Sequence, residues 1–115
     1  MKKITMTTCV IIALFLCLPA VNYAAPQNCD KAGAKKLMAK MRPQMVQSVT
    51  TDAGWVIVTF GQDYFNWTDR QTEGLVTTYA NLDACITGQA RSLEFRSPSG
   101  KLIARADSFR GIQMK

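Results

Sequence analysis

The chain contains no histidine, and this absence narrows the chemistry that it can perform. Histidine is the side chain that most often serves as a general acid or base, and it is the commonest metal ligand. The sequence also contains no G-x-S-x-G nucleophile motif and no glycine-rich phosphate loop. We therefore predict no catalytic residue, no cofactor and no metal site, and we expect a protein that binds rather than an enzyme.

Long apolar runs are missing too, except at the N-terminus. Residues 1–3 (Met-Lys-Lys) form a short basic head, an uncharged run follows over residues 4–18, and Pro19 ends it. Small residues come next at Ala24 and Ala25, and this order is typical of a bacterial secretory signal peptide. The run falls short of the roughly 20 residues that a membrane-spanning helix needs. We therefore expect a cleaved signal peptide rather than a membrane anchor.

The expected mature chain is one small exported domain. We predict cleavage after Ala24, with Ala25 as the second choice, so that residues 1–24 leave and residues 25–115 remain. No later segment of the sequence is apolar enough to span a membrane, which predicts a periplasmic or secreted location. Cleavage removes two lysines and lowers the formal net charge of +6 by two units. The remaining length suits one domain with one hydrophobic core.

Cysteine is scarce: the chain has four, and two of them, Cys9 and Cys17, belong to the expected signal peptide. Cys29 and Cys85 remain, and in an oxidising compartment a lone pair of cysteines usually forms a disulfide. Redox-active pairs normally lie close together as C-x-x-C, whereas these two are far apart in the sequence. We therefore predict a structural disulfide between Cys29 and Cys85.

The first helical pattern covers residues 30–48. Its apolar side chains recur three and four positions apart, but Pro43 conflicts with one uninterrupted helix. The helix therefore either kinks at Pro43 or gives way there to a second short helix. Met38, Met41 and Met45 share one face, which we interpret as core rather than as a copper(I) site.

The clearest helix is predicted for residues 68–88. Thr68 begins a Thr-x-x-Gln capping box, and Gly88 is a natural terminator. Cys85 lies near the end of this helix and Cys29 near the start of the first. The predicted disulfide would therefore tie the two helices together.

Three segments are predicted strands. Residues 55–60 are rich in β-branched and aromatic side chains, and residues 50–54 before them are expected to form a loop. Residues 91–96 and 101–106 alternate apolar and polar side chains around a turn, which predicts a β-hairpin with one polar face. The side chains expected to face the core in its second strand are Leu102, Ala104 and Ala106.

Together these elements predict a small single-domain α+β fold in the order helix, strand, helix, strand, strand. The helical crossover between the first two strands favours parallel or skip-one pairing with a right-handed connection. We expect a three-stranded sheet with its helices packed mainly on one face and pinned by the disulfide. Residues 107–115 show no clear periodicity, and we assign no element to them.

The residues expected to bind a protein partner come from an aromatic loop and from the polar face of the hairpin. They are Tyr64, Trp67, Arg96, Lys101 and Arg105. Aromatic rings give a large contact area at low entropic cost, so an exposed Trp67 or Tyr64 would suit recognition. The alternative is that a small domain buries these rings in its core. The hairpin of a three-stranded sheet would also leave an open edge for an extended partner segment.

A second candidate surface consists of the basic residues of the first helix. They are Lys31, Lys35, Lys36, Lys40 and Arg42. Together with the basic hairpin they suggest an anionic partner such as lipid or a cell-wall polymer, although an ordinary solvated surface would explain them as well. The sequence contains no known nucleic-acid-binding motif, so we expect no specific nucleic-acid recognition.

Three carboxylates, Asp63, Asp69 and Glu73, cluster in sequence at a strand-to-helix junction. Paired carboxylates can act as general acid and base in a small hydrolase. Turn formation by Asp63 and the position of Asp69 at a helix N-terminus explain them without catalysis. We therefore expect a small non-enzymatic accessory protein of the bacterial cell envelope that engages a protein partner. A binder of anionic surfaces is the alternative, and a small hydrolase is the third interpretation.

Overall fold

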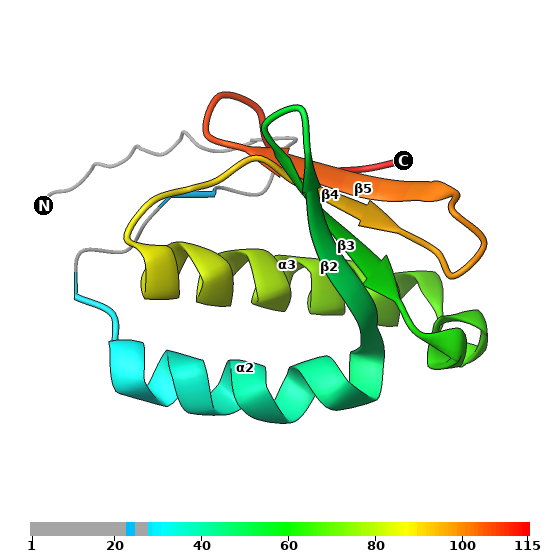
Figure 1. Ribbon diagram of the computed structural model, residues 1–115, viewed down its shortest axis with the longest axis horizontal. Helices are drawn as coiled ribbons and strands as arrows, with labels where there is room; N and C mark the ends of the chain where they lie inside the picture. Colours follow the sequence, from blue (N-terminus) through cyan, green and yellow to red (C-terminus); the bar gives the residue numbers. More distant parts are fainter. Residues whose placement is uncertain (1–22, 25–27) are drawn as a thin grey trace, which may run out of the picture.

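The computed structural model describes residues 23–24 and 28–115, which form an α+β domain with two α-helices and a five-stranded mixed sheet (Figure 1). The expected signal peptide, residues 1–24, lies outside the described residues apart from its last two. The expected start of the mature chain, residues 25–27, lies outside them as well. Neither described helix has the length and apolar character needed to cross a membrane.

The first helix, α2, spans Lys31–Met45 and is shorter than the sequence predicts. Pro43 lies inside its last turn, and a strand rather than the alternative second short helix follows directly at Val46. Proline lacks the N–H that would bond the carbonyl four residues earlier and its ring crowds that turn, and the helix ends two residues after it. From Val46 the chain is extended, since the Val-Thr-Thr segment that follows has a stronger preference for strand than for helix.

The extended segment is strand β2 (Val46–Asp52), where the sequence predicts the end of a helix and then a loop. It pairs antiparallel with β3 (Trp55–Phe60), which is the predicted strand. Ala53 and Gly54 connect the two strands with φ angles of 51° and 86°. Two left-handed residues in a two-residue loop are typical of a type I′ hairpin turn.

The second helix, α3 (Asp69–Thr87), matches the prediction at both ends. Thr68 accepts a hydrogen bond from the Gln71 backbone N–H, and the Gln71 side chain accepts one from the Thr68 backbone N–H, which completes the capping box. Gly88 ends the helix with a left-handed φ of 80°. A short 3-10 helix, η1 (Gln62–Asn66), connects β3 to α3.

Three further strands complete the sheet: β4 (Leu93–Arg96), β5 (Leu102–Asp107) and β6 (Gly111–Met114). Their order is β2-β3-β4-β5-β6, with β3 and β4 parallel as predicted and the other neighbours antiparallel. The predicted three-stranded sheet is therefore wrong by two strands, β2 and β6. The strand β6 forms because the Asp107 carboxylate accepts hydrogen bonds from the backbone N–H groups of Phe109 and Arg110, which turns the tail back against β5.

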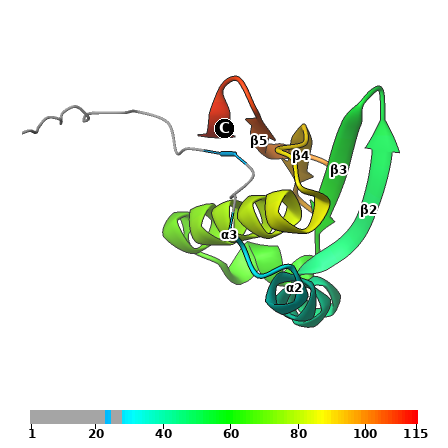
Figure 2. The ribbon, with the colours of Figure 1, turned by 90° about the vertical axis from the view of Figure 1, so that its left-hand side faces the viewer.

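Both helices lie on one face of the sheet, as predicted (Figure 2). The core between them contains Met38 and Met41 from α2 and the largest fully buried side chains of the domain. The apolar ones among these are Phe60, Phe95, Leu93, Val58 and Val76. In the hairpin, Ala104 and Ala106 are buried as predicted, but a register irregularity beside Arg96 buries Ile103 and leaves Leu102 half-exposed.

The predicted disulfide is present between Cys29 and Cys85, whose Cα atoms are 5.9 Å apart. Cys29 precedes α2 and Cys85 lies in the last turns of α3. The bond therefore joins the two helices on the covered face of the sheet.

Candidate functional site

The aromatic loop is folded against the core rather than presented to solvent. Tyr64 and Trp67 are half-buried, and their rings lie 6.1 and 5.2 Å from the Phe60 ring centroid. The ring left exposed is Phe65, with 61% of its surface accessible. Partner binding by Tyr64 and Trp67 stays a prediction, and the structure gives both of them a role in closing one end of the core.

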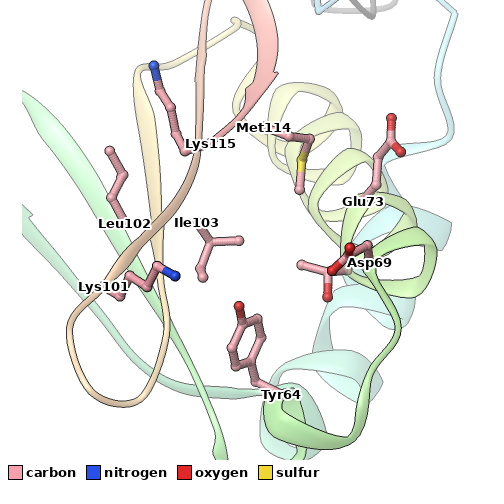
Figure 3. Close-up of a pocket in the computed structure, with 9 residues that line it drawn as sticks. Tyr64, Asp69, Glu73, Lys101, Leu102, Ile103, Met114 and Lys115 are labelled. Atoms are coloured by element: carbon pink, nitrogen blue, oxygen red, sulfur yellow. The ribbon is translucent and has the colours of Figure 1, made fainter.

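A cavity of about 340 Å³ lies between η1, the first turns of α3 and the C-terminal strands (Figure 3). Asp69 and Glu73 line it from α3, and Lys101 and Lys115 from the strands. Figure 3 shows the Tyr64 hydroxyl and the Lys101 side chain directed toward its centre, whereas the end of Lys115 points away. The cavity thus has an acidic wall, a basic wall and an apolar floor.

This cavity brings together two of the three predicted carboxylates. Asp69 and Glu73 line it, and Asp63 is not among the lining residues. Both lining carboxylates are exposed, whereas general acids are usually held in buried or apolar surroundings. Among the residues that the structure describes, no group of three or more cysteine, aspartate or glutamate side chains could hold a metal ion. The geometry therefore favours solvated charges over an acid–base pair.

The face of the sheet opposite the helices carries a buried carboxylate. Ile57, Glu94, Arg105 and Gln113 are neighbours in register across β3 to β6, so they share this face. Glu94 is only 5% exposed. It accepts hydrogen bonds from Arg96 Nε at 2.6 Å and from Arg105 Nε at 3.2 Å.

Because of Glu94, two of the predicted partner-binding residues have a structural role within the sheet. Arg96 and Arg105 are half-exposed on the helix-free face, but Glu94 compensates part of their charge. The Arg105 guanidinium also lies 5.0 Å from the Trp55 ring centroid, a cation–π distance. Lys101, the remaining predicted cation of the hairpin, is exposed and lines the cavity in Figure 3.

A second hollow, of about 510 Å³, opens on the helix-free face beside these arginines. Its lining includes Trp55, Arg105, Arg110 and Lys115, together with Phe109, which is 96% exposed. Sequence reasoning missed Phe109, because no strand was expected to follow it. The signal was an aromatic residue placed two positions after Asp107, an aspartate able to order a turn.

The basic residues of α2 are all exposed, as the predicted basic patch requires. They are Lys31, Lys35, Lys36, Lys40 and Arg42. At 3.6 residues per turn they do not form one stripe. Lys31, Lys35 and Arg42 lie along one flank of the helix, and Lys36 and Lys40 lie opposite the buried methionines.

The hairpin formed by β4 and β5 has no free edge, which corrects the expectation that a partner could pair with it. β3 covers one side and β6 covers the other. Among the described strands, the sheet ends at β2 and β6. An extended partner segment could therefore pair with β2 or β6, and not with the β4–β5 hairpin as predicted.

A partly buried ion pair fixes the loop between α3 and β4. Arg91 Nε donates a hydrogen bond of 3.0 Å to Asp83 Oδ2, and its Nη2 contacts the other carboxylate oxygen. The hydrogen bond to Asp83 raises the pKa of Arg91 above its usual range. Burial raises the pKa of the Tyr79 hydroxyl on the same helix. Arg91 and Asp83 hold the loop in place, and neither they nor Tyr79 line the two hollows described above.

We found no family model, curated protein or solved structure that matches the chain. Its function is therefore inferred from the surfaces described above.

Proposed function

We propose that this chain is a small exported, non-enzymatic accessory protein of the bacterial cell envelope, and that it engages a protein partner by strand pairing at the β2 edge. The observation that carries the proposal is the edge itself. β2 is seven residues long, most of its side chains are exposed, and it contains no lysine, arginine or proline. Natural edge strands usually carry such residues to prevent pairing with other chains.

The hairpin geometry indicates which backbone groups face outward. Asp52 and Trp55 flank the type I′ turn, so they exchange both ladder hydrogen bonds, and Thr51 opposite Val56 does not. Val56 confirms this pattern, because its N–H donates 2.9 Å to the Ser92 carbonyl on the other side of β3. The N–H and C=O of Thr51 therefore point away from the sheet, as do those of Val49.

The other edge is a poorer template for pairing. β6 has four residues, and Lys115 follows it. Lysine and short length are two of the features that protect edges. The signal-like N-terminus and a disulfide that suits an oxidising compartment support export.

A pair of substitutions at Thr51 separates backbone pairing from side-chain contact. Thr51→Pro removes the outward N–H while keeping the β2–β3 ladder, because proline is tolerated where an edge N–H faces solvent. Thr51→Ala keeps the N–H and removes only the exposed side chain. Each variant would be immobilised, oxidised, and used to capture proteins from an envelope extract of the source cells, with washes at low and high salt.

The proposal expects a discrete protein that the wild type and Thr51→Ala retain at high salt and that Thr51→Pro releases. Circular dichroism melts of all three proteins would control for folding. Equal capture by Thr51→Pro would contradict edge pairing. A concentration-dependent dimer abolished by the same substitution would identify a second copy of this chain as the occupant instead.

A binder of anionic surfaces is the second candidate, and the exposure of all five basic residues of α2 favours it. Sedimentation with phosphatidylglycerol vesicles tests this candidate directly. Charge-driven binding should weaken steeply as salt rises, and Lys36→Glu with Lys40→Glu should abolish it. Binding that neither salt nor these substitutions reduce would contradict this candidate.

A further inference from the structure

Tyr23 packs in the core of the domain, although the expected cleavage after Ala24 would remove it. Its side chain is 5% exposed and belongs to the main hydrophobic cluster. Its hydroxyl donates a 2.7 Å hydrogen bond to the Arg91 carbonyl, in the loop between α3 and β4. Burial raises the pKa of this hydroxyl, as it does for a phenol held away from water.

Tyr23 lies over a part of the sheet that would otherwise lack cover from the helices. Figures 1 and 2 show its short segment between α3 and the C-terminal strands, on the side of α3 away from α2. The helix α2 therefore does not cover this part of the sheet. Ala106 and Ile112, on β5 and β6, belong to the same buried cluster as Tyr23. An aromatic ring buries roughly 150–250 Å². The Tyr23 side chain therefore covers much of the part of the sheet that α2 does not reach.

The disulfide lowers the conformational entropy that is lost when Tyr23 docks into the core. Cys29 is fixed to α3 through Cys85, and only five residues separate it from Tyr23. The chain entropy lost by placing the ring is therefore that of a short tethered segment. Without Tyr23 the core would lose the ring and the Arg91 carbonyl would lose its donor, two changes that each destabilise a folded domain.

We infer that Tyr23 belongs to the mature fold, and that export processing cuts on its N-terminal side. Ala20 is the small residue between the apolar run and Tyr23, so the Ala20–Val21 bond is the bond that processing would use. A signal peptidase adds water across this bond, which leaves a carboxylate on Ala20 and an ammonium group on Val21. The processing step rests on the proposed export, whereas the structural role of Tyr23 does not.

Intact-mass measurement and N-terminal sequencing of the exported protein test the processing step. The full chain would be produced in the source cells and recovered from the envelope and the medium. A mature N-terminus at Val21 is the expected result. An N-terminus at Ala25 or Pro26, or an exported chain that keeps Met1, would overturn the assignment.

Thermal unfolding of the oxidised chain 21–115 tests the structural role independently of export. Tyr23→Ala should lower Tm by on the order of 10 °C or more, as expected for loss of a buried aromatic ring from a small domain. Tyr23→Phe, which loses only the hydroxyl, should lower it less. Ala24→Ser, at the exposed neighbouring position, is the control and should leave Tm unchanged. If Tyr23→Ala and chain 25–115 melt at the same temperature as the unaltered chain, Tyr23 is not part of the fold.

Discussion

Replacing Glu94 by glutamine should destabilise the domain, because it removes a buried negative charge that two arginines share. Glutamine has almost the same shape, so the packing against β3 and β5 is kept. The carboxylate accepts one hydrogen bond from Arg96 Nε and one from Arg105 Nε. Glutamine retains one acceptor oxygen, and its NH₂ group would face the second guanidinium, donor against donor.

The size of the effect follows from the burial of each partner. A hydrogen bond to a charged group contributes about 1.5–3 kcal/mol, and breaking a fully buried ion pair costs about 3–5 kcal/mol. Here the acid side chain is 6% exposed, whereas the side chains of Arg96 and Arg105 are 39% and 43% exposed. The arginines can turn to water, so solvent screening reduces the cost. We expect a loss of about 2 kcal/mol in the free energy of unfolding.

Urea unfolding of the wild type, Glu94→Gln, Arg105→Gln and the double variant would measure this loss. The cycle removes the cation–π contribution of Arg105 over Trp55, because that contact is lost equally in both arginine variants. A coupling of about 1 kcal/mol between Glu94 and Arg105 is expected. A loss below about 0.5 kcal/mol for Glu94→Gln, the range of ordinary surface substitutions, would show that the burial of this acid does not stabilise the fold.

Three other results are expected. Replacing both Cys29 and Cys85 by alanine should lower the free energy of unfolding by about 4 kcal/mol, since the bond closes a loop of 56 residues; equal urea midpoints would contradict this. Ala53→Asn should stabilise the domain by up to about 1 kcal/mol, because asparagine tolerates the left-handed φ of 51° better than alanine, and a lower Tm would refute it. Burial raises the pKa of Tyr23 and Tyr79 above 10.0, so the contribution of these two groups to stability should be constant below that pH and fall above it as the unfolded tyrosines ionise; urea midpoints above pH 10 should fall less for Tyr23→Phe.

Local signals in the sequence were sufficient for the helices and for strand β3. The capping box at Thr68 and the glycine at position 88 set both ends of α3, because each acts within one turn of the chain. The β-branched and aromatic run of β3 identified it in the same way. The pairing of the two distant cysteines followed from their number and their expected compartment.

The edge strands could not be predicted in the same way, because they form through neighbours rather than through their own pattern. β2 follows α2 without a break, and its polar side chains gave no alternation to detect. It becomes a strand because the type I′ turn at Ala53 and Gly54 folds it onto β3. β6 similarly depends on the turn that Asp107 orders and on the β5 edge that this turn reaches.

The candidate site was only partly accessible to sequence reasoning. Composition identified the exposed cations of α2 and the carboxylates that line the cavity in Figure 3. It could not show that Glu94 binds Arg96 and Arg105 from within the sheet, because that contact depends on the register of β4 and β5. The core position of Tyr23 was hidden for another reason: its segment has the composition of a cleavage region, and only tertiary packing gives it a structural role.

Under the proposed pairing at β2, the backbone would contact the partner and no side-chain recognition motif would be needed. The large aromatic residues of the loop, Tyr64 and Trp67, pack around Phe60 and stabilise the core. What β2 would offer to the proposed partner is a row of backbone N–H and C=O groups, which every sequence carries. Such an edge needs only a strand that is long, exposed and free of protective lysine or proline. For a protein that binds through its backbone, the topology of the sheet would therefore indicate the function better than any set of side chains in the sequence.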